Sequence, residues 1–314
     1  MTKVSVIIVC MNRLDNLYPC LRSMKSFTQT PLEILVVAYL FNKDYLERAR
    51  KDFPDVIFIE SDSTRGFAEN NNLALERATG DYCFILNDDT EFIAPVIDPL
   101  VEDMEKLPPE CAIVSPKILN ADDTLQLCGR PHFTAFQYVL EKYHLYKEHL
   151  DDTVGKPPVM DSIYPTSNIC GAAFLIKTDI FRELGWFDER FFFTPEDIAL
   201  STLAREKGYK VYVDSSVEIR HKWHATASKM IIATHPSAMR GTLQFFSRGS
   251  NFRYLLIGIP VFIAETCKAV KTFFVCLVNS SDDNVITLVS YLNNIRSIFT
   301  HRSAKEIFVR FFRK

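Results

Sequence analysis

The sequence predicts an α/β protein in which a mostly parallel central sheet carries helices on both faces. Short apolar runs rich in Val, Ile and Phe have the length of buried strands, and longer stretches with helical periodicity separate them. Strands that alternate with helices in this way favour parallel pairing, with the helices packed on the sheet. The chain has 314 residues, of which 47% are hydrophobic, so it is long enough for one large domain and an appendage.

The predicted strands and helices alternate from the start of the chain. The helices expected between the first strands are Leu14–Phe27, Asp44–Asp52 and Phe67–Thr79, and Gly80 closes the last of them. Six apolar runs are expected to form the sheet: Val4–Val9, Glu33–Leu40, Val56–Glu60, Tyr82–Leu86, Ala112–Val114 and Gly171–Ile176.

The pattern weakens in residues 120–165. This stretch contains Pro131, Gly155, Pro157 and Pro158, which predicts a partly irregular insertion over one end of the sheet. Regular structure is then expected to resume, with a helix from Thr178, a turn at Gly185, a helix over Glu196–Lys207 and a pair of strands within Lys210–Arg220.

A change of composition near His235–Pro236 divides the chain into a main domain, residues 1–235, and a helical extension, residues 236–314. Three charged residues at helical spacing interrupt the apolar stretch Tyr254–Val278, whereas a membrane-spanning helix needs ~20 mostly apolar residues. An amphipathic helix is therefore expected there. The final residues interleave basic and Phe side chains, which fits a helix lying on an anionic membrane surface or one that packs its Phe side on the main domain.

Charge and cysteine usage exclude some classes of function. The formal net charge is −3, whereas a nucleic-acid binder is usually basic, so no nucleic-acid partner is expected. The eight cysteines form no C-x-x-C pair and mostly stand among apolar residues, which indicates buried thiols in a reducing compartment. The apolar run Val4–Val9 is too short for a secretory signal. We expect a cytoplasmic protein, peripheral on the inner face of the cell membrane if its tail binds lipid, and leave self-association into a homo-oligomer open.

Acidic residues follow the fourth predicted strand. The run Tyr82–Leu86 ends abruptly in Asn87, Asp88 and Asp89. Asn-Asp-Asp is common in turns, but open α/β sheets bind ligands at the carboxyl ends of their strands. Carboxylates are ligands for Mg²⁺ and Mn²⁺, which bind through one or two of them together with substrate phosphates. These three residues are therefore a candidate metal and phosphate site.

Two further stretches fit a bound nucleotide. Asn12 and Arg13 follow the first strand directly, although many strands end in a polar turn. Residues 65–72 read R-G-F-A-E-N-N-N, a glycine turn that opens a helix with three amides in succession. Capping explains one asparagine but not three, and the backbone N–H groups of a helix start favour phosphate oxygens.

A third stretch places Glu196 and Asp197 after Pro195, at the start of a predicted helix and close to aromatic residues 186–193. Acids in a first helical turn usually complement the helix dipole. Aromatic neighbours would in addition desolvate a carboxylate, which raises its pKa and suits it to accepting a proton. Downstream, His221 ends a strand and His224 follows; a strand-end histidine is usually structural but can complete a metal site with carboxylates.

The order of these motifs resembles the family 2 inverting glycosyltransferases with the GT-A fold, within the rhamnosyltransferase-like branch. The matching order is an apolar strand ending in Asn-Arg, then G-F-A-x-x-N-N, L-N-D-D, G-A-A-F-L-I, G-W-F-D-E-x-F-F, E-D-I, R-x-x-G-Y-K-V and a strand ending in His. Each motif is weak alone. Their common order over residues 3–228 makes the resemblance specific.

The resemblance implies a role for each matching residue. Asp197 would be the catalytic base, and the metal ligands would be Asp89 and His221, with His224 as the alternative histidine. Mg²⁺ or Mn²⁺ would be the cofactor. The acceptor side would include Trp186 and Glu196, and the remaining residues would hold the donor: Asn12, Arg13, Arg65, Asn71, Asn72 and Asp88.

The implied function is transfer of a sugar, with rhamnose as one candidate, from a UDP- or dTDP-sugar to a saccharide or lipid-linked acceptor in cell-surface polysaccharide synthesis. Two positions depart from the family: Ala38 replaces the base-contacting Asp after the second strand, and Ala199 replaces an acid after Glu196-Asp197. The choice of nucleotide is therefore open. The alternatives are a sugar nucleotidyltransferase, which usually has a glycine-rich loop where Cys10–Arg13 has no glycine, and a catalytically decayed transferase that acts as a binding subunit.

Overall fold

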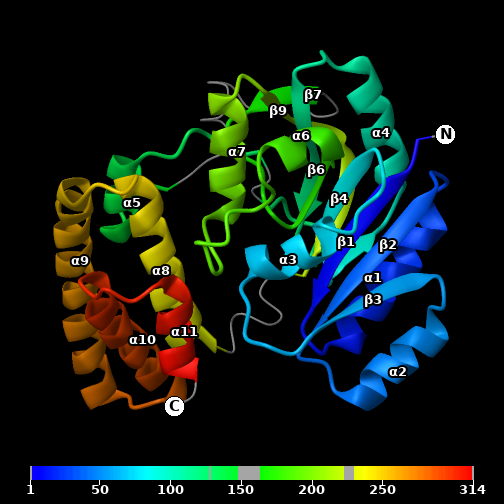
Figure 1. The fold of residues 1–314 in the computed structure, drawn as a ribbon. Helices are drawn as coiled ribbons and strands as arrows, with labels where there is room; N and C mark the ends of the chain where they lie inside the picture. The colour runs from blue at the N-terminus through cyan, green and yellow to red at the C-terminus, as the bar shows by residue number, and fades with distance from the viewer. Residues whose placement is uncertain (1, 127–128, 148–162, 223–229, 313–314) are drawn as a thin grey trace. The chain divides into compact units, whose positions relative to one another are not determined.

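The computed structural model describes residues 2–126, 129–147, 163–222 and 230–312 (Figure 1). The chain forms two compact units. An α/β unit holds residues 1–132, 148–188 and 197–223, and a helical unit holds residues 133–147, 189–196 and 224–314. The boundary predicted at residue 235 falls inside a helix, because α8 runs from Ile231 to Ser247.

A mixed sheet forms the centre of the α/β unit. Its strands are ordered β3-β2-β1-β4-β8-β6-β9-β5, and β7 pairs with β9. The first four are mutually parallel, as predicted, whereas β8 runs antiparallel to both of its neighbours. The bounds are β1 Val4–Cys10, β2 Leu32–Tyr39, β3 Val56–Ser61, β4 Tyr82–Asn87, β5 Thr90–Phe92, β6 Cys111–Leu119, β7 Ile163–Thr166, β8 Ala173–Lys177 and β9 Lys210–His221.

Helices cover both faces of this sheet, which confirms the predicted fold class. Alternate residues of β1 point to opposite faces: Val6 and Ile8 pack with α1 and α4, whereas Ile7 packs with α3, α6 and α7. A further helix, α2, lies beside β3 (Figure 1). The bounds of the helices of this unit are α1 Leu14–Phe27, α2 Lys43–Asp52, α3 Phe67–Leu75, α4 Ile97–Lys106, α6 Thr178–Glu183 and α7 Glu196–Glu206.

The predicted pair of strands within Lys210–Arg220 was wrong, because β9 is one continuous strand. The register with β6 shifts between Pro116 and Lys117, which marks a bulge. There Asp214 accepts hydrogen bonds from the backbone N–H and the hydroxyl of Ser216, at 2.8 and 2.6 Å. This Asp-Ser-Ser sequence makes the local hydrogen bonds of a turn without reversing the chain. The insertion expected over residues 120–165 also contains order that was not predicted, namely α5 at Ala135–Lys142 and β7.

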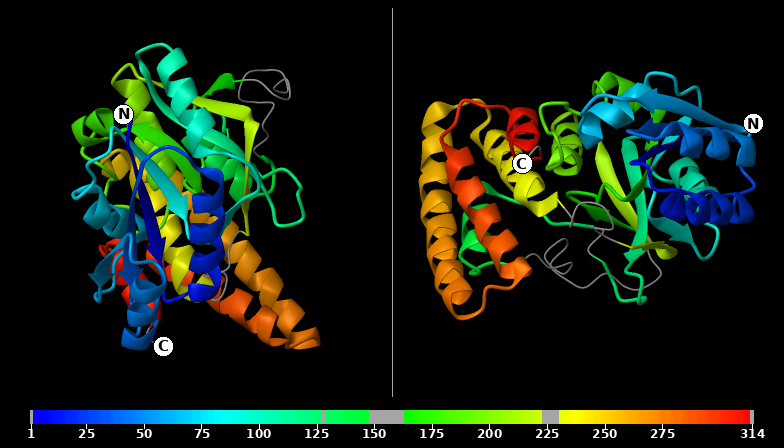
Figure 2. Two further views of the ribbon diagram at one scale, coloured as in Figure 1. Left: turned by 90° about the vertical axis from the view of Figure 1, so that its right-hand side faces the viewer. Right: turned by 90° about the horizontal axis from the view of Figure 1, so that it is seen from below.

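The helical unit confirms a C-terminal helical region. In it α9, Asn251–Val278, and α10, Asp282–Ile298, pack along each other (Figure 2). Among the described residues, no helix is both long and apolar enough to span a bilayer. α11, Ala304–Phe312, buries Ile307, Phe308 and Phe311, and the Phe308 ring lies 4.9 Å from that of Phe192. Phe192 belongs to the main domain as predicted, residues 1–235, although it lies in the helical unit of the structure. The Phe side of the tail is therefore packed on the protein, which is the second of the two predicted arrangements.

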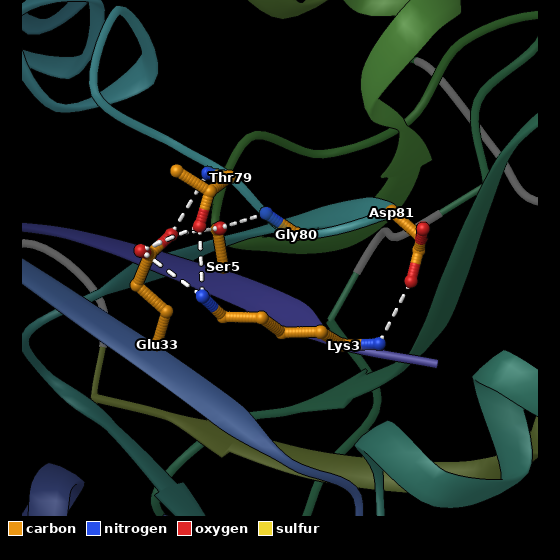
Figure 3. A network of polar contacts seen from close by, with 6 residues as sticks. All are labelled: Lys3, Ser5, Glu33, Thr79, Gly80 and Asp81. Carbon is orange, nitrogen blue, oxygen red and sulfur yellow. Dashed lines mark hydrogen bonds and ion pairs between the residues drawn. The ribbon is translucent and has the colours of Figure 1, made fainter. Parts of the chain in front are cut away.

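A polar network joins the amino-terminal ends of β1, β2 and β4 (Figure 3). The Glu33 carboxylate accepts hydrogen bonds from the Ser5 hydroxyl, the Thr79 N–H and hydroxyl, and the Lys3 ammonium, at 2.5–3.3 Å. Gly80 donates its N–H to the Ser5 hydroxyl, and a Cβ there would lie 2.6 Å from the Ser5 nitrogen, so the close approach needs glycine. Burial raises the pKa of Glu33, but these hydrogen bonds outweigh it and leave the pKa below its usual 4.5.

Glu33→Gln is expected to lower the free energy of unfolding by about 1–3 kcal/mol at pH 7, because a partly buried, charge-assisted network loses the charge of its acceptor. A carboxylate whose pKa is lowered by folding stabilises the protein above its unfolded pKa and loses that effect as the pH falls. The difference in the free energy of unfolding between the parent and Glu33→Gln should therefore become smaller below about pH 4.5. Denaturant unfolding at pH 7 and pH 4 checks this, with the exposed Glu60→Gln as the control that should change little. Equal losses in both variants would contradict the prediction.

Candidate functional site

The carboxyl ends of β3, β2, β1 and β4 lie along one edge of the sheet, because these strands are parallel and adjacent. This edge brings together predicted donor and metal-binding residues that follow three of the four strands. Asn12 and Arg13 follow β1, Arg65 follows β3, and Asp88 and Asp89 follow β4. The structure thus gathers at one edge residues that the sequence places up to 77 positions apart, from Asn12 to Asp89.

Asp89 and His221 are neighbours at this edge. The short strand β5 runs antiparallel to β9 with Thr90 opposite His221, which places the preceding Asp89 beside the histidine ring. Asp89 Oδ1 lies 3.2 Å from His221 Nε2, and both side chains are almost fully buried. The Asn87 amide nitrogen lies 3.3 Å from the same Nε2. The predicted pairing of a strand-end carboxylate with His221 is therefore present, while His224 lies outside the described residues.

The other ring nitrogen of His221 has a partner that the sequence did not predict. His221 Nδ1 lies 2.7 Å from Gln126 Oε1, and the Gln126 side chain is buried. Gln126 stands in a turn after β6, where its backbone N–H donates to the Ile118 carbonyl. Nothing in the sequence around Gln126 resembles a ligand motif, so only the fold reveals this contact.

Asp88 is the least well satisfied carboxylate of the edge. Its Oδ2 atom is buried and has no hydrogen-bond partner among the described residues. Burial raises the pKa of Asp88 to about 7, with the Cys10 thiol donating a hydrogen bond that opposes the rise and Asp89 adding to it. A buried carboxylate oxygen without a partner suits a site that binds a cation or a ligand hydroxyl.

The described residues contain no cluster of three or more His, Cys, Asp or Glu side chains that would hold a metal alone. Among the described residues the protein can offer Asp89 and His221, and phosphate oxygens and water could complete the ligands of a bound ion. Mg²⁺ binds in this way at phosphate sites. The edge therefore fits a divalent cation that arrives with a phosphorylated ligand.

Asp197 is held beside the same edge by backbone contacts. Its Oδ2 accepts the Gly171 N–H at 3.2 Å, and the next residue, Ala172, accepts the Asn87 N–H through its carbonyl at 2.9 Å. The Arg130 guanidinium lies 3.8 Å from Asp197 Oδ2. Neither contact was predicted from the sequence.

The aromatic stretch near Asp197 serves two separate cores. Phe187 packs against Phe174 and Phe181 in the α/β unit, whereas Phe192 packs against Phe308 in the helical unit. Desolvation of Asp197 by this stretch stays a prediction. The acceptor-side roles of Trp186, whose ring packs on Phe181, and of the buried Glu196 also stay predictions.

The amides of α3 are largely used by the protein itself. Asn72 donates to the Phe187 carbonyl at 2.9 Å and accepts the Phe187 N–H at 3.1 Å, and the Asn71 amide donates to the Phe67 carbonyl at 2.8 Å. Both ends of the Asn72 amide thus fasten the loop around Phe187, and the nucleotide-binding role of Asn72 stays a prediction. Asn71 is fully buried, so its predicted contact with a nucleotide gains no support.

Asn12, Arg13 and Arg65 are better placed for a ligand. The side-chain oxygen of Asn12 accepts the Asn42 N–H at 3.0 Å, and Arg13 pairs with the exposed Asp15. Arg65 donates to the Ser61 hydroxyl at 3.0 Å at the end of β3. Both arginines are partly exposed, so each keeps surface that can meet a phosphate or a ribose.

Most of this edge lies in a part of the chain that is similar to a known protein family. Residues 5–157 match the model of glycosyl transferase family 2. These residues, just under half of the chain, are therefore similar to family 2 glycosyltransferases. The matched residues include β1 to β4 and Asn87–Asp89, whereas Asp197 and His221 follow them along the chain.

A curated relative and two solved structures extend the match. The O-antigen biosynthesis protein RfbC of Myxococcus xanthus is 24% identical over 237 residues, which cover 72% of this chain and 18% of that protein, so this chain spans under a fifth of its relative. A crystal structure of GalNAc-T7 with UDP, GalNAc and Mn²⁺ has a TM-score of 0.56 and 16% identity, covering 76% of this chain and 51% of that one. The mannosyltransferase PcManGT of Pyrobaculum calidifontis, in complex with GDP-Man and Mn²⁺, has a TM-score of 0.51 and 15% identity, covering 93% and 86%. The α/β unit therefore has the GT-A fold.

Proposed function

We propose that the chain is a metal-dependent, inverting glycosyltransferase that moves a sugar from a nucleoside-diphosphate sugar to a hydroxyl group of an acceptor. The observation that carries the proposal is the buried pair of Asp89 Oδ1 and His221 Nε2, 3.2 Å apart at the carboxyl edge of the parallel strands. The two solved structures of similar fold hold a nucleotide or nucleotide sugar together with Mn²⁺, which supports a donor and a divalent ion at this edge.

Asp89 and His221 would hold Mg²⁺ or Mn²⁺, and the ion, when bound, would neutralise the charge that develops on the leaving diphosphate. Asp88 would bind the donor sugar or ribose, and Arg13 and Arg65 would meet the diphosphate or the nucleoside. These contacts fix the anomeric carbon for attack and place charge where it is needed in the transition state.

Asp197 would act as the general base. An acceptor hydroxyl attacks the anomeric carbon from the face opposite the diphosphate, its proton passes to the Asp197 carboxylate, and the bond to the diphosphate oxygen breaks. Attack from the opposite face inverts the anomeric configuration. The Gly171 N–H and the Arg130 guanidinium on Oδ2, together with the Ile198 N–H on Oδ1, would orient the carboxylate toward the acceptor.

The acceptor is proposed to be a saccharide or a lipid-linked saccharide of a cell-surface polysaccharide, with rhamnose as one candidate for the transferred sugar. The similarity to an O-antigen biosynthesis protein supports the pathway. Contact with a lipid surface would not use the apolar side of α11, which is buried. Apolar side chains exposed along α9, Phe252, Leu256, Ile259 and Phe274 among them, are better placed for it.

Thermal-shift measurements against UDP-, dTDP- and GDP-sugars, with and without Mn²⁺, test this function. A donor that binds the folded protein should raise its apparent stability by about 2.7 kcal/mol at a concentration of 100 times Kd, and more with the metal than without it. Stabilisation by a sugar 1-phosphate with a nucleoside triphosphate would favour a nucleotidyltransferase instead. Donor binding without any Mn²⁺-dependent hydrolysis of the donor would favour a decayed, binding-only subunit.

A further inference from the structure

A chain of hydrogen bonds leads from His221 to the surface of the α/β unit. His221 Nδ1 lies 2.7 Å from Gln126 Oε1, and Gln126 Nε2 donates to Asn120 Oδ1 at 2.8 Å. Asn120 Nδ2 donates to the Thr124 hydroxyl at 2.9 Å, and that hydroxyl donates to Asp122 Oδ1 at 2.6 Å. All four partners stand in the turn after β6, which is closed by the bridge between Leu119 and Leu125. The inner end of the chain is buried, and Asp122 at its outer end is exposed.

The carboxylate at the outer end determines which group donates and which accepts in each of these hydrogen bonds. Hydrogen bonds from Thr124 hold the pKa of Asp122 below its usual range, so Asp122 is ionised at neutral pH and can only accept. The Thr124 hydroxyl must then donate to Asp122 and accept from the Asn120 amide. This leaves Asn120 Oδ1 to accept from Gln126 Nε2.

The orientation of the Gln126 amide in turn determines which ring nitrogen of His221 carries a proton. With its nitrogen directed at Asn120, Gln126 turns its oxygen toward His221, and an amide oxygen can only accept. His221 Nδ1 must therefore carry a proton, and Nε2 is the nitrogen left for Asp89. The Asn87 amide nitrogen, 3.3 Å from Nε2, fits the same tautomer because it has hydrogens to donate to a lone pair.

We propose that Gln126 is a positioning residue: backed by Asn120, Thr124 and Asp122, it keeps the proton of His221 on Nδ1 and presents the Nε2 lone pair to a divalent cation beside Asp89. The inference rests on the proposed function in one respect, namely that a cation binds between Asp89 and His221. A ligating histidine needs its second nitrogen to be hydrogen-bonded in this way, and loss of such a partner typically weakens metal binding 10–100-fold. Here the partner is a neutral amide whose orientation is set by a carboxylate on the surface.

The tautomer of His221 can be measured without any metal. Long-range ¹H–¹⁵N correlation spectra at alkaline pH distinguish a proton on Nδ1 from one on Nε2, and the signal missing in His221→Asn identifies the residue among the seven histidines. The parent should show the proton on Nδ1. Gln126→Leu should give a mixture of tautomers, and Gln126→Glu, which keeps an acceptor, should restore the Nδ1 form.

The metal arm measures Mn²⁺ affinity by the electron paramagnetic resonance signal of the free ion. Gln126→Leu is expected to bind Mn²⁺ 10–100-fold more weakly than the parent. Asn120→Leu removes the acceptor that orients the Gln126 amide, so it should also give a mixture of His221 tautomers. This variant tests the inference if Gln126→Leu does not fold. Asp123→Asn is the matched control in the same turn, because Asp123 pairs with Arg220 instead of joining the chain.

An unchanged Nδ1 tautomer in folded Gln126→Leu, or in Asn120→Leu if the former does not fold, would overturn the inference. Failure of the proposed function gives a different result. In that case the parent itself would bind no Mn²⁺, while the metal-free tautomer measurement would still decide whether Gln126 sets the protonation of His221.

Discussion

Asp197→Asn is expected to reduce the rate of sugar transfer by about 10²–10⁴-fold while the affinity for the donor and for Mn²⁺ stays near the parental value. The asparagine keeps the shape of the side chain and an oxygen that can accept the Gly171 N–H. It cannot take the proton of the acceptor hydroxyl. The loss should therefore appear in turnover and not in binding, as measured by transfer assays at saturating donor and by calorimetry of donor binding.

Asp179→Asn is the matched control for this substitution. Asp179 and Asp197 both stand in the first turn of a helix, and each accepts the N–H of the following isoleucine at 2.8 Å. If Asp197 served only to begin its helix, both variants would show the same small loss of stability and unchanged transfer. A parental transfer rate in Asp197→Asn would remove the general base from this site and with it most of the proposed mechanism.

Asp89→Ala is expected to weaken Mn²⁺-dependent donor binding by at least about 100-fold, the upper end of what loss of an outer-shell partner costs, because it removes one of two protein ligands. The fold should survive, since Asp89 stands in the turn between β4 and β5 and not in the apolar core. Calorimetric titration of donor with and without Mn²⁺ measures the effect, and circular dichroism confirms folding. His221→Ala should act in the same direction because it removes the other ligand.

Asp81→Ala provides the comparison at the opposite end of the same strand. Asp81 precedes β4 and accepts the Lys3 N–H at 2.9 Å, far along the strand from the candidate site. Asp81→Ala should therefore lower the stability of the fold and leave donor and Mn²⁺ binding unchanged. Donor and Mn²⁺ binding by Asp89→Ala that equals binding by the parent would show that Asp89 is only a turn residue.

The N-terminal strands and the acids after them are readable from sequence because their signals are local. An apolar run such as Tyr82–Leu86 is buried whatever its neighbours are, and parallel strands bring their carboxyl ends to one edge. Asn12, Arg13, Asp88 and Asp89 could therefore be placed near one another from their positions after predicted strands. The antiparallel direction of β8 was not readable, because an apolar run carries no sign of its direction.

Other features depended on contacts between residues far apart in the chain. The Asp-Ser-Ser sequence after Val213 makes a bulge and not a turn because β6 continues alongside it. The contact of the Asn72 amide with the backbone of Phe187, 115 positions later, was likewise not predicted from the sequence.

The sequence by itself determined the fold class, the strand ends and the acids that stand at them, since these follow from short-range apolar periodicity and turn chemistry. Only the tertiary structure decided which polar groups meet. The Gln126 side chain lies within hydrogen-bond distance of His221, 95 positions away, and the Asp197 carboxylate contacts the Gly171 N–H and the Arg130 guanidinium. The physical reason is that a buried polar atom must find a partner wherever the fold offers one, and the packing of the whole chain sets that choice.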